Sequence, residues 1–562
     1  MKRRLFALLL SVCAMLSCYH LLLHPAFPSS PLQAEPSPMK KILLVPLDGR
    51  PPCRQFVMDA GRIADYDVVA PPQELQDYYS LPGDTAGLRS WIRENIKGSH
   101  AVILSIDQLL YGGLLAAREK NASPEEIAAM LSFLSEVHAE SPDIPIYAFS
   151  ILPRLTPQDT IDGYEERRDL VEYSRLAGRK DAGLPVDEAR LSSLEERIPP
   201  ESMQKYLAHF HENTALNKQL ANLAQKGVLA RLVLGQDDGE AYSIPNTEKN
   251  ALRDYLAEQG ISDDLVFLAH GADEIALTLL AEIKNRELGL RPRVFLAYND
   301  ESSEKGIMPY MAVSTGECAR EKLRLLHAVP TLSPEEADFT LFISTNDSDK
   351  DTLGTRESSA RYLRQLQAQG HPAALVDLSK HFRESEILLP QLIRNGYPIN
   401  SLMAYAGWNT TSNSIGTALA QSCLFLGASS RAGTRKDAIR LYTAQLAFLQ
   451  NRILEDAFYL KDVIDLVNTE LVKAGFTNTA DLDLERNARW ANAMLQHAMK
   501  ERIAAYKETT AFRRPIHIAT PEGDLCLRIG SLAADMGYPW PRTFEIHLRT
   551  TIQLEECKEN FP

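Results

Sequence analysis

The sequence predicts an α/β fold, in which a (β/α) barrel-like parallel sheet is followed by a mainly helical C-terminal domain that ends in a few strands. Short apolar runs rich in Val, Ile and Leu recur along the chain, and each is followed by turn residues and then by an amphipathic helical pattern. Strands that alternate with helices in this way build a parallel sheet. After about Ala432 the alternation stops, and longer helices take its place.

Nine apolar runs have the length and the flanking breaker residues of strands that are buried on both faces. They cover residues 42–47, 101–106, 144–152, 231–234, 265–269, 293–297, 339–344, 373–378 and 402–405. Eight or nine strand–helix units in one chain favour a (β/α) barrel, and a doubly wound sheet is the alternative.

Helical periodicity fills the intervals between these runs. Amphipathic helices are clearest at 123–139, 202–225 and 356–369. The polar segment at about 158–197 is rich in Arg and Glu and contains three glycines. It indicates an insertion after one strand, helical in part and placed to fold over the site. Because strands and helices alternate throughout, we expect one α/β domain at 40–435.

The last part of the chain has a different pattern. Long helices are predicted at 437–456 and 482–506, and β-like alternation at 516–529 and 544–552. We therefore expect a second, smaller domain at 436–562.

The N-terminus has the pattern of a secretory signal. Three cations at positions 2–4 precede an almost wholly apolar run at 5–23, and a Pro- and Ser-rich stretch follows. A basic start, an apolar centre and a small residue before a polar segment are typical of a cleaved signal peptide. We expect residues 1–34 to be removed after Ala34, with 35–39 as a short linker.

Two other outcomes stay open for this segment. The apolar run is long enough to remain as an uncleaved anchor, and Cys18 is a poor but usable lipoprotein-type acceptor. In each case the protein is exported, to the periplasm, the cell surface or the medium. No later segment has the roughly 18 uninterrupted apolar residues of a membrane helix, so we expect no membrane span in the mature chain.

The charge of the chain argues against a nucleic-acid partner, and its cysteines argue against a zinc site or a disulfide framework. The chain has 60 Lys and Arg against 74 Asp and Glu, a net charge of −14, and removal of the signal makes it about −17. Because no basic cluster stands out, we expect no nucleic-acid partner. Five widely spaced cysteines remain after the signal, which does not indicate a zinc site or a disulfide framework. One bridge, Cys526–Cys557, stays open in an oxidising compartment.

Polar side chains follow nearly every predicted strand. In parallel α/β folds ligands bind beyond the carboxyl ends of the strands, so these side chains are the candidates for a substrate site. They are Asp48, Arg50, Asp107, Tyr111, Arg154, Glu240, Asp273, Glu274, Asp300, Trp408, Asn409 and Asn413. For any one Asp or Asn among them, a turn or a helix cap is the simpler explanation.

Asp237 and Asp238 are less easily explained as a cap, because a cap needs only one side chain. Two neighbouring carboxylates at a strand end suit general acid/base catalysis. The negative charge of one raises the pKa of the other, so the two pKa values move apart. We therefore predict that Asp237 and Asp238 are the catalytic pair.

Two other groups of residues have functional and structural explanations of similar weight. Trp408 could form a flat wall against a sugar ring with Asn409 and Asn413 binding hydroxyls, or it could be a core residue before a helix cap. Arg50 and Arg154 could bind an anionic group or neutralise the neighbouring carboxylates.

Cofactor motifs are missing from the sequence. It contains no GxGxxG, no P-loop and no GxSxG, which disfavours NAD, FAD and ATP and a nucleophile-elbow hydrolase. We expect no organic cofactor, and a divalent metal stays open.

Four motifs together resemble an uncharacterised bacterial family, catalogued as a domain of unknown function. They are VPLDGRP at 45–51, SIDQLLYGG at 105–113, GQDDGE at 235–240 and GWNTTSN at 407–413. The resemblance covers roughly Lys40 to the C-terminus and implies no activity. Asp237, Asp238, Trp408 and Asn409 also resemble, more weakly, barrel glycosidases that use an Asp-Asp pair with substrate assistance.

These features favour an exported hydrolase that acts on a glycan or glycoside by a two-carboxylate mechanism, which needs no cofactor. Asp238 is predicted to be the general acid/base, and Asp237 to orient a water or an acetamido group. The first alternative is a metal-dependent hydrolase whose oxygen ligands come from strand ends, namely Asp48, Asp107, Asp237, Asp273 and Asp300. The second is a non-catalytic envelope protein that binds a glycan or a small solute.

Overall fold

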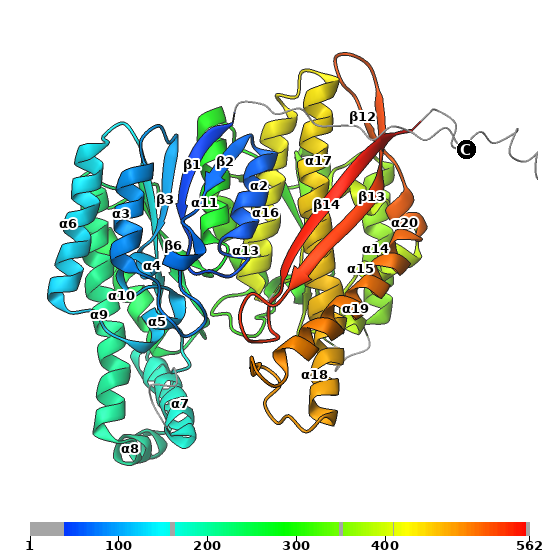
Figure 1. The fold of residues 1–562 in the computed structure, drawn as a ribbon. Coiled ribbons are helices and arrows are strands. Elements are labelled where there is room, and N and C mark those ends of the chain that lie inside the picture. The colour runs from blue at the N-terminus through cyan, green and yellow to red at the C-terminus, as the bar shows by residue number, and fades with distance from the viewer. Residues whose placement is uncertain (1–38, 158–162, 348–351, 409, 558–562) are drawn as a thin grey trace, which may run out of the picture.

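The computed structural model describes residues 39–157, 163–347, 352–408 and 410–557. Within these residues, eleven parallel strands form two separate open sheets (Figure 1). The first sheet has the order β2-β1-β3-β4-β5-β6 and contains β1 (Lys40–Val45), β2 (Tyr66–Val69), β3 (Ala101–Ser105), β4 (Ile146–Leu152), β5 (Arg231–Gln236) and β6 (Val266–His270). The second has the order β11-β10-β9-β7-β8 and contains β7 (Arg293–Tyr298), β8 (Val329–Thr331), β9 (Phe339–Asn346), β10 (Ala373–Ser379) and β11 (Tyr405–Ala406).

The α/β class and the parallel sheets are confirmed, but the strands do not close into the single barrel favoured by the sequence. In each sheet the chain places its second strand on one side of the first and its third strand on the other. This reversal of strand order is the mark of a doubly wound sheet. It leaves β2 and β6 as free edges of the first sheet, so no barrel forms.

All nine predicted strands are present, and two edge strands escaped prediction. β2 has the sequence YDVV and β8 the sequence VPT. Both are short and half-exposed, and Pro330 removes a ladder donor from β8. Neither strand therefore has the continuous apolar run that marks the central strands.

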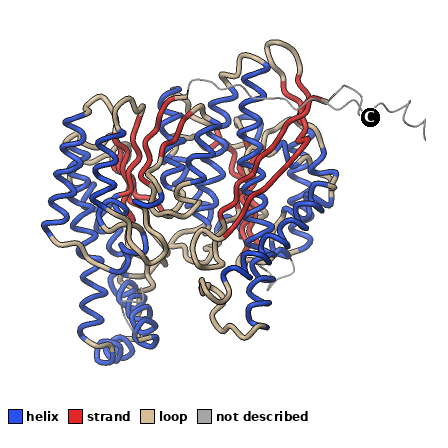
Figure 2. The backbone as a smooth tube through the Cα atoms, viewed as in Figure 1, coloured by secondary structure: helices blue, strands red, loops and turns tan. Residues whose placement is uncertain are grey.

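Helices cover both sheets (Figure 2). The first sheet is flanked by α2 (Gln55–Ile63), α3 (Thr85–Asn95), α6 (Pro124–Glu140), α9 (Pro200–Gln225), α10 (Ile244–Glu258) and α11 (Ile275–Leu288). The second is flanked by α13 (Thr315–Leu325), α14 (Leu353–Ala368) and α16 (Thr411–Ser429). α11 and α16 pack against each other and are almost wholly buried. Because one apolar cluster includes Ile42 of β1 and Ile343 of β9, the two sheets share a core.

The polar insertion is largely helical where it is described. It forms α7 (Tyr164–Asp181) and α8 (Glu188–Arg197), while residues 158–162 lie outside the described residues. Together with the first turns of α9, these helices project beyond the carboxyl end of the first sheet (Figure 1). A small cluster that includes Leu194 and Tyr206 holds them together.

The C-terminal region is helical and ends in strands, as predicted. α17 (Arg435–Arg452) continues into a π-helix, η5 (Ile453–Val463), and then into α18 (Ile464–Lys473) and, after a loop, α19 (Ala488–Lys507). An antiparallel sheet follows, made of β12 (Ile516–Ile518), β13 (Leu525–Gly537) and β14 (His547–Glu556). β14 packs on α17, where Thr550 Oγ1 donates to the Ala447 carbonyl at 2.6 Å. The β13–β14 loop returns to the carboxyl ends of both sheets.

The predicted signal peptide, its lipoprotein alternative at Cys18 and residues 35–38 of the linker lie outside the described residues. Among the residues that are described, no helix has the length and apolar character needed to cross a membrane.

Cys526 and Cys557 lie opposite each other where β13 and β14 meet. Both are free thiols here, and the Cys557 amide donates to the Cys526 carbonyl at 2.9 Å. Burial and the neighbouring Cys526 raise the pKa of the Cys557 thiol to about 12, so it is protonated at neutral pH.

We expect oxidised glutathione to join Cys526 to Cys557. The bond would close a loop of about 30 residues and raise the free energy of unfolding by up to about 3 kcal/mol. Thiol titration of the denatured protein without its signal should then find three free thiols instead of five. Five remaining thiols, or loss of two thiols in Cys526→Ser as well, would contradict the pairing.

Candidate active site

A cavity of about 340 Å³ lies at the carboxyl ends of both sheets. We call it the Asp237 cavity. Its walls come from the ends of β1, β4, β5, β6, β10 and β11, from α5 (Leu114–Glu119) and from the β13–β14 loop. Six predicted site residues line it: Arg50, Arg154, Asp237, Asp238, Asp273 and Asn413. The doubly wound sheets therefore gather the strand ends as a barrel would, since all parallel strands of a sheet end at one edge.

Asp237 and Asp238 follow β5 and are held there by the main chain. The Leu155 amide donates to the Asp238 carbonyl at 2.9 Å, and the Gly239 amide donates to the Tyr310 carbonyl at 3.2 Å. These bonds tie the loop after β5 to the loops after β4 and β7. The position of the pair is therefore set by three strand ends.

The two carboxyl groups have different surroundings. Asp237 Oδ2 accepts from Arg118 Nε at 3.0 Å, and Asp237 Oδ1 accepts from the Asp238 amide at 2.9 Å. None of the described residues donates a hydrogen bond to the Asp238 carboxyl group in the way that Arg118 does to Asp237. Asp238 is half-buried and lines the cavity.

These surroundings move the two pKa values in opposite directions. Burial acts to raise the pKa of Asp237, but the charges of Arg118 and Arg154 outweigh it, and the pKa is lowered. Burial and the nearby charge of Asp237 raise the pKa of Asp238 to about 7. Near pH 7 the pair therefore holds about half a proton more than two ordinary carboxylates, and that proton belongs mainly to Asp238.

Arg118 was not predicted, and its place depends on the SIDQLLYGG motif. Asp107 lies in the short helix α4 (Ile106–Leu110), and the chain then turns through Gly112 and Gly113, whose φ values are 87° and 127°. A Cβ on Gly113 would lie 2.8 Å from the Asp77 carboxyl group. The two glycines thus permit the turn that starts α5 and brings Arg118 to Asp237.

Arg50 forms the centre of a second buried network. Its Nη2 donates to Asp48 Oδ2 and to Asp273 Oδ1, both at 2.6 Å, and Asn413 Nδ2 donates to Asp273 Oδ2 at 3.2 Å. The guanidinium also lies 5.5 Å from the ring centre of Trp540. One arginine therefore joins the ends of β1 and β6 to the β13–β14 loop, which explains the charge pair in VPLDGRP.

This arrangement disfavours a metal bound by the five aspartates considered above. Asp48 and Asp273 come close enough to share an ion, together with Cys53, but the Arg50 guanidinium already supplies the cation between them. Asp107 instead accepts from the Ile151 amide at 3.0 Å, and burial raises its pKa to about 7. Asp300 caps α12 (Glu301–Lys305) by accepting from the Ser303 amide at 2.8 Å.

A second group of possible metal ligands lies at the end of the second sheet. Asp347, His381 and Glu386 place a ligand atom each within 4.8 Å of one another. His381 Nδ1 lies 2.7 Å from Glu386 Oε1, and the next residue, Phe382, lines the Asp237 cavity. Lys380 Nζ also lies 2.8 Å from Asp347 Oδ2, so a cation is present beside this group as well.

A hydrogen-bonded chain of side chains lies behind one part of the cavity lining. It joins the strand-end residues Gln236 and His270 through Lys249 of α10. Lys249 Nζ lies 2.6 Å from Gln236 Oε1 and 2.8 Å from His270 Nε2, and His270 Nδ1 lies 2.8 Å from Glu321 Oε2. Burial lowers the pKa of Lys249 to about 8. Both ring nitrogens of His270 have a hydrogen-bond partner, so His270 fixes the position of Lys249 and Glu321 relative to the cavity lining.

Two buried amide atoms of the cavity lining have no partner among the described residues. They are Gln236 Nε2, a donor, and Asn413 Oδ1, an acceptor. Buried polar atoms are almost always paired, and exceptions in a native structure call for a ligand or a water.

Three predicted residues lie away from the cavity lining in paired positions. Tyr111 donates to Glu212 Oε1 at 2.6 Å, Glu240 pairs with Arg175 at the surface, and Glu274 pairs with the buried Lys322. Their positions suit structural roles, the simpler explanation for such side chains.

The cluster after β11 contributes Asn413 but not its tryptophan. Trp408 is 4% exposed and packs against Phe544, with ring centres 5.9 Å apart. It is a core residue, and Phe544 lines the cavity in its place. Asn409 lies outside the described residues.

The chain matches a model of one protein family. A family model described as "Protein of unknown function (DUF4127)" matches residues 42–549. The chain belongs to this family. The match to DUF4127 extends from β1 into β14 and so includes every residue that lines the Asp237 cavity. A search of the curated proteins found no match.

Proposed function

We propose that this DUF4127 protein is an exported hydrolase that cleaves a glycan or glycoside, with Asp238 as general acid/base and Asp237 as its ionised partner. One observation carries the proposal: two adjacent carboxyl groups line one cavity, and their pKa values are moved in opposite directions. Such a difference assigns the acid and the ionised group in carboxylate hydrolases. The export signal read from the N-terminus supplies the location.

In this mechanism Asp238 gives its proton to the leaving oxygen and then takes a proton from the attacking group. Asp237 stays ionised beside Arg118 and orients a water or the acetamido group of the substrate. Phe382, Phe544 and the 58% exposed Tyr310 add apolar surface to the lining, which suits a sugar ring.

A metal-dependent hydrolase is the second candidate, and the group Asp347, His381 and Glu386 favours it. A catalytic zinc ion takes three protein ligands and leaves one position for water, and this group supplies three side chains of types that bind zinc. Phe382, the residue after His381, lines the Asp237 cavity, so the chain connects this group directly to the proposed substrate site.

The test compares the purified protein with its Asp237→Asn/Asp238→Asn double variant on chromogenic glycosides, including N-acetylhexosaminides, with and without EDTA. Turnover that is absent from the variant and indifferent to EDTA supports the two-carboxylate mechanism. Turnover abolished by EDTA and restored by Zn²⁺ supports the metal candidate. Binding of glycans without turnover by either protein would overturn both and favour a binding protein.

A further inference from the structure

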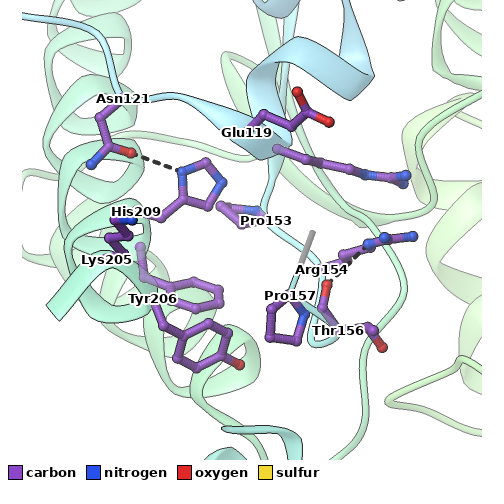
Figure 3. A pocket seen from close by; sticks show the side chains of 11 residues that line it. Glu119, Asn121, Pro153, Arg154, Thr156, Pro157, Lys205, Tyr206 and His209 are labelled. Atoms are coloured by element: carbon purple, nitrogen blue, oxygen red, sulfur yellow. Dashed lines mark hydrogen bonds between the residues drawn. The ribbon is translucent and has the colours of Figure 1, made fainter. Parts of the chain in front are cut away.

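A second cavity of about 380 Å³ adjoins the first (Figure 3). We call it the His209 cavity. Arg118, Arg154 and Thr156 line both cavities. A ligand that occupied both would therefore cross the Asp237–Arg118 ion pair, next to Asp238. Each cavity lies within the volume range of small-molecule sites, roughly 300–1,000 Å³.

The wall of the His209 cavity is mostly carbon. Pro153 and Pro157 lie on one side, and Tyr206 and Phe210 of α9 pack edge to face with ring centres 5.0 Å apart. The Tyr206 hydroxyl donates to the Leu155 carbonyl at 2.9 Å, so the polar end of this ring is already satisfied by the protein. The remaining surface suits a flat or extended apolar group.

His209 does not bring a charge to this wall. Its Nδ1 lies 3.0 Å from Asn121 Oδ1 (Figure 3), and burial lowers its pKa to about 4. At neutral pH the imidazole is therefore uncharged, and it adds another aromatic face to the cavity.

Four charged side chains line the cavity among the described residues. Three are cations, Arg118, Arg154 and Lys205, and one is a carboxylate, Glu119. The Lys205 side chain is 57% exposed, and its ion pair within the described part of the chain is a long one, 3.6 Å to Glu201 one turn away on α9. Because Arg118 is already paired with Asp237, the exposed Lys205 is the cation that would meet an anionic group bound in this cavity.

We propose that the His209 cavity is a second compartment of the substrate site, which binds an apolar ring or acyl group that carries a negative charge. The group is a carboxylate or a phosphate, and the polar part of the same substrate lies in the Asp237 cavity. The proposal rests on the proposed function for the bond that is cleaved, but the binding of the apolar anion does not depend on catalysis.

Calorimetric titration with three small probes tests the compartment without any turnover. The probes are 1-naphthoate, 1-naphthyl phosphate and the uncharged 1-naphthalenemethanol, each titrated into the full protein. We expect one or both anions to bind at least about fivefold more tightly than the alcohol, the effect of one partly exposed ion pair of about 1 kcal/mol. The tighter anion identifies the carboxylate or the phosphate as the preferred group.

Variants locate the binding. Lys205→Gln should remove most of the preference for the anion, and His209→Trp, which fills the cavity, should weaken all three probes at least about tenfold, as loss of a buried aromatic contact does. Lys218→Gln is the matched control, because Lys218 lies on the same helix but against Tyr255. Circular dichroism confirms that each variant is folded.

The same titrations separate this proposal from the proposed function. Asp238→Asn should bind the anions as the unaltered protein does, even where it has lost turnover. Absence of anion binding at millimolar concentration, or equal affinity of all probes for Lys205→Gln and the unaltered protein, would overturn the compartment while leaving the catalytic pair untouched.

Discussion

Asp238→Asn is expected to lower kcat by at least about 100-fold, because general acid/base catalysis contributes at least that factor. The asparagine side chain keeps the shape of the aspartate but has no proton to give to a leaving group. Since none of the described residues donates to the Asp238 carboxyl group, its loss leaves no buried donor unpaired. The variant should therefore fold normally, and KM should change much less than kcat.

The pH dependence of kcat/KM follows from the same two groups. As a general acid Asp238 must be protonated, so activity should fall as the pH rises through about 7, the pKa to which burial and Asp237 raise it. Asp237 must be ionised, and its lowered pKa keeps it so down to acidic pH. Replacing Arg118 with Met removes the nearest positive charge from Asp237, so the acidic limb of the profile should move to higher pH.

Glu240→Gln provides the matched control for these kinetics. Glu240 lies two residues after Asp238 but faces the surface, where it pairs with Arg175. Loss of its charge should leave kcat and the pH profile within about twofold of the unaltered protein, the small effect of an exposed ion pair. An Asp238→Asn protein with unchanged turnover would show that Asp238 is not the acid.

The elements of this fold could be read from the sequence because the central strands are buried on both faces. Each then appears as a continuous apolar run, such as residues 101–105 in β3. The connection of the strands could not be read in this way. A barrel and a doubly wound sheet use the same strand–helix units and differ in the place of the next strand: in a barrel β3 would lie beyond β2, whereas here it lies on the other side of β1. That choice leaves no periodicity in the chain.

The site was predictable to the extent that it consists of strand ends. Asp237, Asp238, Asp273 and Arg50 follow their strands directly, and parallel strands bring such residues to one edge. Arg118 lies more than ten residues beyond the end of β3, and Phe544 comes from a loop of the C-terminal sheet. No local pattern marks either residue. Trp408 was predicted to be a site residue but lies in the core, because an aromatic residue after a strand can pack in the core as readily as it can line a cavity.

Arg452→Met is expected to give the largest loss of stability in the C-terminal region. Arg452 is fully buried at the point where α17 passes into the π-helix η5, and its guanidinium carbon lies 3.3 Å from the ring centre of Phe56. Its Nη1 donates to Asp456 Oδ1 at 2.8 Å, and its Nη2 pairs with Glu455. Removal of the cation leaves two buried carboxylates uncompensated, which costs about 3–5 kcal/mol.

The loss of stability in Arg452→Met should also depend on pH, because the protonation of the two buried carboxyl groups determines its direction. Burial raises the pKa of Glu455 to about 7 in spite of Arg452. The folded protein thus holds this proton more firmly than the unfolded chain does, so the free energy of unfolding falls as the pH rises from the ordinary glutamate range to about 7. Without Arg452 the pKa values of Glu455 and Asp456 rise further. Arg452→Met should therefore be more destabilised at pH 8 than at pH 5.

Urea unfolding at both pH values measures the effect, and Arg440→Met on the same helix is the control. Arg440 is partly exposed and pairs with Asp65 and Asp437, so its loss should cost no more than about 1 kcal/mol at either pH. Asp456 Oδ2 also accepts from the Gly407 amide at 2.9 Å, just before α16 and Asn413. Because this bond ties the π-helix to a wall of the Asp237 cavity, Arg452→Met should weaken ligand binding in the cavity before it unfolds the protein. Equal losses of unfolding free energy in Arg452→Met and Arg440→Met, independent of pH, would contradict the stabilising role of Arg452.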